Sequence, residues 1–269
     1  MELAPDRLGP TVCLGEILVE IVATTIGDGF REAQPLVGPY PSGAPAIFID
    51  QCGRFGGSAA MIGAVGDDDF GRVNLERLVR DGVDISAIAI DRTLPTGSAF
   101  VRYRADGSRD FVYNIATSAA ARIGRTDAVE RLLARAGHLH VMGTALSMQN
   151  TWAMVEWAVQ AVKARGGSLS LDPNLRKELH HDAATAAQFS RLVAMSDLLL
   201  PSGAELERAA GVAGEAAAVA RLLDLGITEI VLKRGADGAS CFRRDGRTDA
   251  AAFVGKGVDP TGAGDCLGG

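Results

Sequence analysis

The residues best suited to chemistry lie near the end of the sequence, in the run from Asp259 to Asp265. Gly262, Ala263 and Gly264 carry almost no side chain, so their backbone N–H groups can approach an anion closely. If a helix begins here, its N-terminal dipole adds to them, and the run forms a cradle for a phosphate or another oxyanion. Asp265 stands beside this cradle, where it could accept the proton of a substrate hydroxyl that attacks a phosphoryl group.

The alternative for this run is a glycine-rich turn whose aspartate only caps a helix. That alternative would be favoured if the four-residue pattern Gly-x-Gly-Asp stood alone. Here Asp259 and Thr261 accompany the glycines, and the run follows elements typical of a parallel sheet. We therefore interpret it as a site for chemistry.

The elements that must position this site alternate between short apolar strands and helices. We predict strands at 11–15, 16–22, 59–65, 85–90, 139–142, 169–172, 197–200 and 229–232, and helices at 46–55, 70–80, 128–135, 151–165, 182–195 and within 204–225. Strands that are buried on both faces and separated by helices form a doubly wound parallel sheet. Its ligands bind beyond the carboxyl ends of the strands.

Two segments break this alternation. Residues 24–45 are rich in Gly, Pro and Ser, which predicts a loop before the helix at 46–55. Residues 96–113 contain the turn sequence 105–108 between two segments with aromatic and basic side chains, which predicts an antiparallel hairpin. A hairpin inside an α/β chain suggests an appendage or lid.

Composition excludes several classes of protein. The 269 residues are 47% hydrophobic, which is enough for a sizeable core, and the formal net charge of −6 with interleaved signs argues against nucleic-acid binding. No apolar run is long enough for a membrane or a secretory signal, so we expect a cytoplasmic protein without a membrane partner. The four cysteines lie far apart, which argues against a zinc site. No Walker-type phosphate loop or dinucleotide-binding glycine motif occurs.

The run from Asp259 to Asp265 resembles the C-terminal signature of the ribokinase-like, or PfkB, family of carbohydrate kinases, and the similarity covers essentially the whole chain. The resemblance implies one α/β domain over 1–269, a three-layer sandwich with a mainly parallel sheet and a small β lid formed by about 17–42 and 94–116. It implies that Gly262, Ala263 and Gly264 form the anion hole and that Asp265 is the general base. Because the family continues beyond this point, we expect the domain to be incomplete at its C-terminus.

The same resemblance assigns residues to the sugar side. Residues 42–46 are similar to the family's N-terminal signature, which places Gly43 and Ala44 beside the sugar, whereas Ile47 stands where a sugar-binding Asn is usual. Glu20 stands where an Asp normally binds sugar hydroxyls, and the alternative is a surface charge on a strand. Arg176, after the strand at 169–172, is a candidate contact for substrate or phosphate.

On the nucleotide side, the resemblance implies ATP and Mg²⁺. Glu205 matches the acidic residue of the family's magnesium motif, although Ser202 replaces its Asn. Lys233 and Gly235 lie in a turn after a parallel strand, where Lys233 could contact phosphate, and Thr261 completes the cofactor-binding set.

We therefore expect an ATP-dependent kinase that phosphorylates a primary hydroxyl of a small sugar, with tagatose or fructose leading. The alternatives are 2-keto-3-deoxygluconate, a nucleoside, or a non-catalytic relic that only binds sugar or nucleotide. The lid could also mediate a homodimer.

Overall fold

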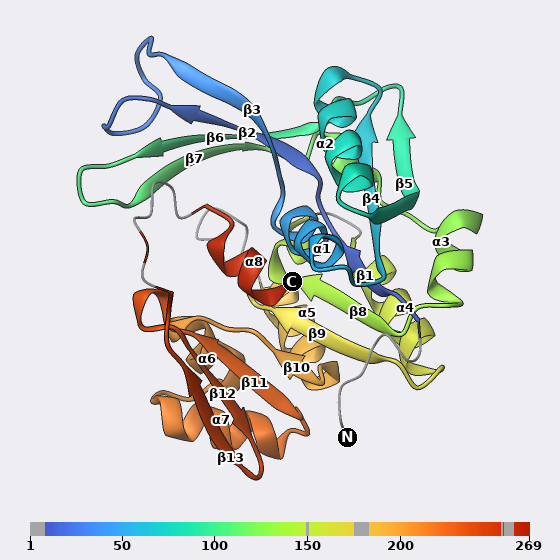
Figure 1. Cartoon of the computed structure of the whole chain (residues 1–269), viewed down its shortest axis with the longest axis vertical. Helices are drawn as coiled ribbons and strands as arrows, with labels where there is room; N and C mark the ends of the chain where they lie inside the picture. Colours follow the sequence, from blue (N-terminus) through green and yellow to red (C-terminus); the bar gives the residue numbers. More distant parts are fainter. Residues whose placement is uncertain (1–8, 149–150, 175–182, 254, 256–260) are drawn as a thin grey trace.

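A computed structural model describes residues 9–148, 151–174, 183–253, 255 and 261–269. Its larger sheet has the strand order β13-β12-β11-β10-β9-β8-β1-β4-β5 (Figure 1). The parallel strands are β1 (Thr11–Leu14), β4 (Ala59–Gly66), β5 (Val83–Asp91), β8 (His138–Met142), β9 (Ser168–Asp172), β10 (Leu198–Leu199) and β11 (Glu229–Lys233). The antiparallel strands β12 (Ala239–Arg243) and β13 (Gly246–Ala250) form one edge. The expected mainly parallel sheet is confirmed.

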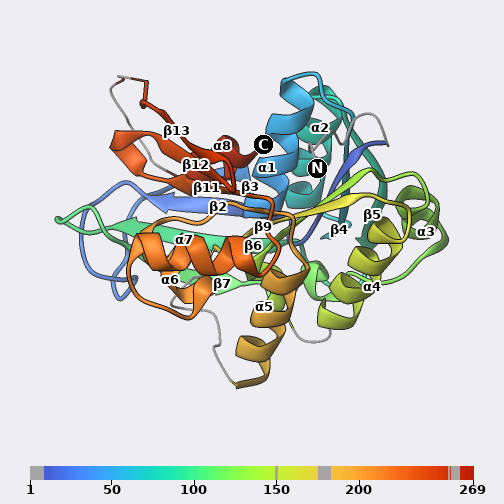
Figure 2. The same ribbon diagram turned by 90° about the horizontal axis from the view of Figure 1, so that it is seen from below.

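Helices cover both faces of this sheet and complete three layers (Figure 2). One face carries α1 (Ala44–Arg54), α2 (Asp69–Arg80) and α8 (Ala263–Gly268). The other carries α3 (Asp127–Leu133), α4 (Thr151–Lys163), α5 (Ala183–Met195), α6 (Gly203–Ala210) and α7 (Glu215–Asp224). Short 3₁₀ helices span Ala119–Arg122, Gly143–Ser147 and Gly235–Asp237.

The core forms because the central strands bury both of their faces. Every residue of β4 and β8 is buried, so these strands show no polar alternation, as is usual between two helical layers. Apolar side chains of the strands pack against the inner faces of the helices in two clusters, one on each side of the sheet. This core fixes the carboxyl ends of the strands, where the candidate residues lie.

A second sheet of four strands projects from this body (Figure 1). Its order is β3-β2-β6-β7, with bounds Leu36–Ser42 for β3, Leu18–Ala23 for β2, Gly97–Tyr103 for β6 and Arg109–Asn114 for β7. Strands β6 and β7 form the antiparallel hairpin predicted for 96–113, which is thus confirmed. The name "small sheet" is used for these four strands below.

Two parts of the secondary structure differ from the sequence-based expectation. The prediction of a loop over 24–45 is wrong for Leu36–Ser42, because an edge strand tolerates Pro39 and Pro41 where no N–H is needed for pairing. The hairpin β12–β13 was not expected, although Asp245 and Gly246 at its turn are a typical hairpin signal. Within the described ranges, no helix is long and apolar enough to cross a membrane.

Candidate active site

A pocket lies between the small sheet and the carboxyl ends of the central strands. Glu16 follows β1, Thr144 follows β8, and the turn before α8 closes the remaining side. The lining residues are acidic (Glu16, Glu20, Asp265), hydroxyl-bearing (Ser42, Tyr113, Thr144, Thr261), apolar (Leu18, Ile47, Ala99, Ile115) or small residues at turns (Gly43, Ala44, Gly262). The pocket therefore combines hydrogen-bonding groups with an apolar wall.

The glycine-rich turn enters this pocket as expected from its residues. Gly262 has φ +75°, a conformation that favours glycine, and it immediately precedes the first helical residue, Ala263. Asp265 lies in the first turn of α8, only 7% exposed, and its Oδ1 accepts a hydrogen bond of 3.3 Å from Asn174 Nδ2. The structure thus places a buried carboxylate beside the backbone N–H groups of a helix start.

The first turn of α1 forms a second wall. Gly43 has φ +103°, and a Cβ at this position would lie 2.6 Å from the carbonyl oxygen of Glu16. Only glycine fits so close an approach between α1 and the end of β1. This contact places Ala44 and the buried Glu16, 4% exposed, on the same pocket. Gly43 and Ala44 are expected from the sequence, whereas Glu16 and Thr144 are not, although both are polar residues that follow parallel strands, where ligands bind.

Lys233 lies beneath the glycine-rich turn and is ion-paired. Its Nζ donates to Asp172 Oδ2 at 2.5 Å, and a Cβ on Gly264 would lie 3.6 Å from the same Nζ. Asp172 is only 1% exposed, and burial raises its pKa to about 7 although Lys233 opposes the rise; Glu205 and Asp265 add to it. Lys233 therefore holds a buried carboxylate at the base of the site.

This raised pKa predicts a pH-dependent contribution to stability. An Asp in the unfolded chain has a pKa of about 3.9. Because the folded state binds the Asp172 proton more tightly, its favourable contribution is complete below about pH 4 and disappears as the pH rises through about 7. We expect the free energy of unfolding of the parent protein, minus that of Asp172→Asn, to decrease as the pH rises from about 4 to about 7. Urea unfolding from pH 4.5 to 8 measures the difference. The exposed-site variant Asp237→Asn is the control, and a difference that rises with pH would contradict the expectation.

The hairpin of the small sheet reaches the glycine-rich turn. Tyr103 Oη lies 3.3 Å from Thr261 Oγ1, and Arg109 Nη1 donates to the same oxygen at 3.2 Å. Within the described residues Arg109 forms no ion pair, whereas Arg104 of the same hairpin is paired with Asp110. Arg109 was not singled out from the sequence, because 152 residues separate it from Thr261.

The other expected nucleotide-side residues are arranged for local structure. Glu205 Oε2 accepts hydrogen bonds from Ser202 N at 2.8 Å and Ser202 Oγ at 2.6 Å, which forms a capping box at the start of α6. Gly235 has φ +59° in the turn after β11. Arg176 and Asp259 lie outside the described residues. The part of the chain that the structure describes contains no group of three or more His, Cys, Asp or Glu that could hold a metal.

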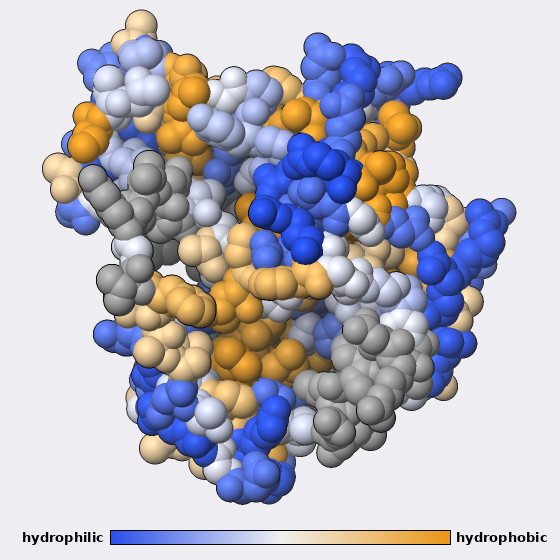
Figure 3. Space-filling view, in the orientation of Figure 1, coloured by the Kyte–Doolittle hydropathy of each residue, from blue (hydrophilic) through white to orange (hydrophobic). Residues whose placement is uncertain are grey.

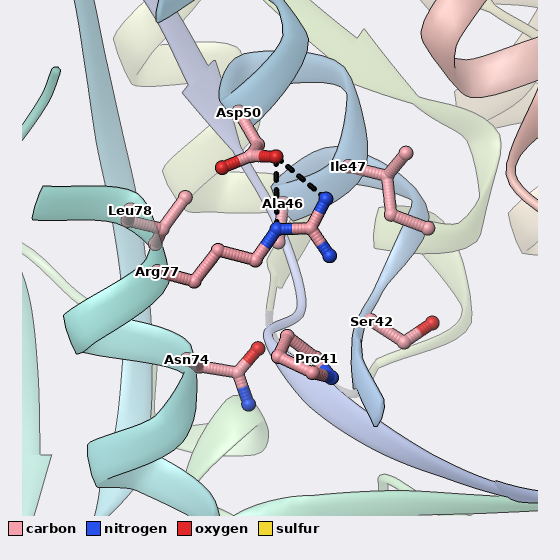
Figure 4. A pocket seen from close by; sticks show the side chains of 8 residues that line it. All are labelled: Pro41, Ser42, Ala46, Ile47, Asp50, Asn74, Arg77 and Leu78. Atoms are coloured by element: carbon pink, nitrogen blue, oxygen red, sulfur yellow. Dashed lines mark hydrogen bonds and ion pairs between the residues drawn. The ribbon is translucent and has the colours of Figure 1, made fainter. Parts of the chain in front are cut away.

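A half-buried ion pair joins α1 to α2 behind the pocket (Figure 4). Arg77 of α2 donates from Nε and Nη2 to Asp50 Oδ2 at 2.9 and 2.7 Å. Burial raises the pKa of Asp50, and the Arg77 guanidinium opposes the rise. Ser42 at the end of β3 and Ile47 of α1 line both the small cavity beside this pair and the main pocket, so the pair supports the part of α1 that carries Ile47.

Comparisons with known proteins agree with this arrangement. The model of a family described as pfkB family carbohydrate kinase matches residues 11–269. Fructokinase-1 of Oryza sativa subsp. japonica is 33% identical over 259 residues, which cover 95% of this chain and 80% of that protein. The 2-dehydro-3-deoxygluconokinase of Thermoproteus tenax is 30% identical over 262 residues, covering 96% and 79%. The structure of a provisionally named ribokinase II from E. coli, in complex with ATP and Mg²⁺, is 40% identical with a TM-score of 0.89, covering 97% and 84%.

Proposed function

Because this chain belongs to the pfkB family of carbohydrate kinases, it is a sugar kinase, and we propose that it transfers the γ-phosphoryl group of ATP to a primary hydroxyl of a small ketose such as tagatose or fructose. The observation that carries the proposal is the single pocket that Glu20 and Asp265 share. A panel of sugars with ATP and Mg²⁺ tests it through sugar-dependent release of ADP. Release that does not depend on any sugar would contradict it.

We assign the chemical step to Asp265. Its carboxylate takes the proton of the sugar hydroxyl, the hydroxyl oxygen attacks the γ-phosphorus in line, and the electron pair of the broken P–O bond leaves with ADP. The backbone N–H groups around Gly262, Ala263 and Gly264 stabilise the charge on the transferred group. The Asn174 hydrogen bond orients the carboxylate toward the pocket.

Residues beside this turn would hold the nucleotide phosphates. We assign Thr261 and the N–H groups of Gly262 and Gly264 to that role, with Gly235 in the adjoining turn. Lys233 is ion-paired with Asp172. We therefore propose that Lys233 supports the glycine-rich turn and that its positive charge attracts the phosphates. Arg109 is the cation that contacts Thr261 directly, which makes it the candidate for the transferred phosphoryl group.

Magnesium does not fit a closed cage of protein ligands in the described residues. Glu205 is the acidic residue on the expected side, but one of its oxygens serves the capping box. Mg²⁺ commonly keeps several waters and binds through substrate phosphates with few carboxylates. We therefore propose that it arrives with ATP, where it neutralises phosphate charge, and that Glu205 approaches it only through water.

Glu20 is expected to bind sugar hydroxyls, since a carboxylate accepts two charge-assisted hydrogen bonds from vicinal hydroxyls. It projects from β2 into the pocket. Glu20→Ala is expected to raise the KM for sugar about 10-fold or more and to leave the KM for ATP nearly unchanged, since about 1.4 kcal/mol is tenfold in binding. Steady-state kinetics with each substrate varied measures both values. The substitution Glu76→Ala, at an exposed residue, is the matched control. Equal effects of Glu20→Ala on both KM values would indicate that Glu20 is only a surface charge.

We propose that the small sheet is the lid of the site and also the surface that meets a second copy of the chain. Leu36, Val37 and Tyr40 of β3 are 43%, 43% and 48% exposed. Figure 3 shows hydrophobic residues scattered among hydrophilic ones on this part of the molecule. Sedimentation velocity is expected to give twice the 28.0 kDa of the chain, and Val37→Asp is expected to shift the mass toward the monomer. A parent protein that stays monomeric at micromolar concentration would contradict this.

A further inference from the structure

A second cavity, of about 510 Å³, lies where the small sheet joins the rest of the molecule. Its walls come from the start of α2 (Phe70), the segment before β6 (Pro95) and the ends of β6 and β7 (Ser98, Asn114). The described residues that line it are all different from those that line the pocket of Asp265. Its volume falls in the range of pockets that bind small molecules, roughly 300–1,000 Å³.

This cavity and the candidate active site lie on opposite faces of the hairpin β6–β7. Successive side chains of a strand point to opposite faces of its sheet. Ala99 of β6 and Tyr113 of β7 line the candidate active site, whereas their neighbours Ser98 and Asn114 line the second cavity. A ligand in the cavity would therefore contact the small sheet from the face that the acceptor sugar does not reach.

A hydrogen-bond network around Asp68 fixes one wall of the cavity. Asp68 Oδ2 accepts a hydrogen bond of 2.8 Å from Thr96 N, and Asp68 Oδ1 accepts bonds of 2.7 Å from Thr96 Oγ1 and 2.8 Å from Gly71 N. Thr96 Oγ1 in turn accepts a bond of 2.8 Å from Gly66 N. These bonds hold the segment before β6 on the start of α2. One wall of the cavity is therefore fixed to α2, while another belongs to the small sheet.

The lining of the cavity suits a monosaccharide. Phe70 and Pro95 supply apolar surface, against which the C–H face of a sugar ring can pack. Ser98, Asn114 and Thr117 supply groups that both donate and accept hydrogen bonds, as sugar hydroxyls do. Asn114 Nδ2 donates to Ser98 Oγ at 3.3 Å, so the Ser98 hydroxyl hydrogen and the Asn114 carbonyl oxygen can be directed to a ligand.

From the position and the lining of this cavity, we propose that it is a second monosaccharide site, whose occupant stabilises the position that the small sheet has in this structure. In this position Tyr103 and Arg109 contact Thr261 beside the glycine-rich turn. A ligand that binds this arrangement better than others shifts the population toward it. Because an acceptor sugar under the small sheet favours the same arrangement, binding at each site raises the affinity of the other. The effect on the reaction rate rests on the proposed kinase function, whereas binding of the second sugar does not.

Amide NMR spectra of the full chain test the binding. D-Fructose and D-glucose are titrated without nucleotide; Ser98 and Thr117 signals report the cavity, and Gly43 and Gly262 signals report the acceptor site. We expect a saturable shift of the cavity signals with at least one of the two sugars. Adenosine is titrated in parallel, and a response of the cavity signals to adenosine in place of the sugars would overturn the proposal.

Two substitutions in the cavity test the assignment to residues. Thr117→Trp places a bulky ring at an exposed lining residue and is expected to abolish the saturable shift of Ser98. Asn114→Ala adds no volume and is expected to weaken the binding about 10-fold, the usual cost of about one good hydrogen bond. Thr248→Trp, at an exposed residue of β13, is the matched control. Sugar titrations of the cavity signals that neither cavity substitution changes would overturn the proposal.

Glu20→Ala separates binding in the cavity from movement of the small sheet. This substitution is expected to shift the midpoint for Gly43 and Gly262 about 10-fold toward higher sugar concentration. The midpoint for Ser98 and Thr117 should shift by no more than a few-fold. Midpoints that shift together would show that the cavity signals report only movement of the small sheet, and the second site would be rejected.

The rate of ADP release against sugar concentration tests the coupling. We expect a sigmoidal curve for the parent protein and a hyperbolic one for Thr117→Trp, because only the parent protein binds the second sugar. A hyperbolic curve for both proteins would overturn the coupling between the sites. If neither sugar supports release of ADP, the proposed ketose kinase function fails for these sugars, and the NMR titrations still decide whether the second site exists.

Discussion

Asp265→Asn is expected to lower kcat by a factor of 10² to 10⁴, the usual range for loss of a general base. The amide cannot accept the hydroxyl proton, although it has nearly the same shape as the carboxylate. Asp265 is 7% exposed and receives a hydrogen bond from Asn174 Nδ2, so the side chain is held in the pocket before substrate arrives. Sugar affinity should change little, because the substitution leaves the walls that carry Glu20 and Ile47 untouched.

Turnover is measured by ADP release, and sugar binding by calorimetry on the same preparations. Cys266→Ala, one position further along α8, is the matched control for a disturbance of this helix. A turnover within a few-fold of the parent enzyme, with unchanged sugar binding, would remove Asp265 from the chemical step. Loss of both turnover and sugar binding would contradict the expectation that the substitution leaves the sugar pocket intact.

The part of this site that could be predicted from the sequence is the part that is contiguous. Asp259, the glycines and Asp265 lie within one run of seven consecutive residues. The small side chains that an anion site requires can be recognised in that run alone. The parallel core could be predicted for a similar reason, because strands such as β4, which are buried throughout, have an unbroken apolar sequence.

The opposite wall could not be predicted in this way. Tyr113 lies in β7 and Ile115 follows that strand, and they line the same pocket as Thr144 only because the small sheet folds over the strand ends. The role of Lys233 also depended on the fold, since its partner Asp172 stands on a neighbouring part of the sheet, 61 residues earlier. Sequence spacing indicates a cation after a strand, but only the packing shows which charge it neutralises.

Arg109 is a second basic residue whose role depends on what it contacts in the folded chain. Its guanidinium contacts Thr261 at 3.2 Å, next to Gly262, while it makes no ion pair within the described part of the chain. A charge held there by the small sheet would meet the transferred phosphoryl group when the sheet closes over the sugar. The lid would then complete the site electrostatically as well as exclude water.

Arg109→Gln is therefore expected to lower kcat by on the order of 10²-fold, the usual cost of removing one preorganised charge or donor from a transition state. The KM for sugar should stay within a few-fold, because Arg109 does not line the pocket that holds the sugar hydroxyls. Arg109→Lys should recover part of the loss, since it restores the charge without the planar fork. Arg104→Gln is the control on the same hairpin, where the side chain is paired with Asp110. If both glutamine variants lose thermal stability and lose kcat in proportion to it, Arg109 only supports the hairpin. A loss of kcat confined to Arg109→Gln places its charge on the reacting phosphoryl group.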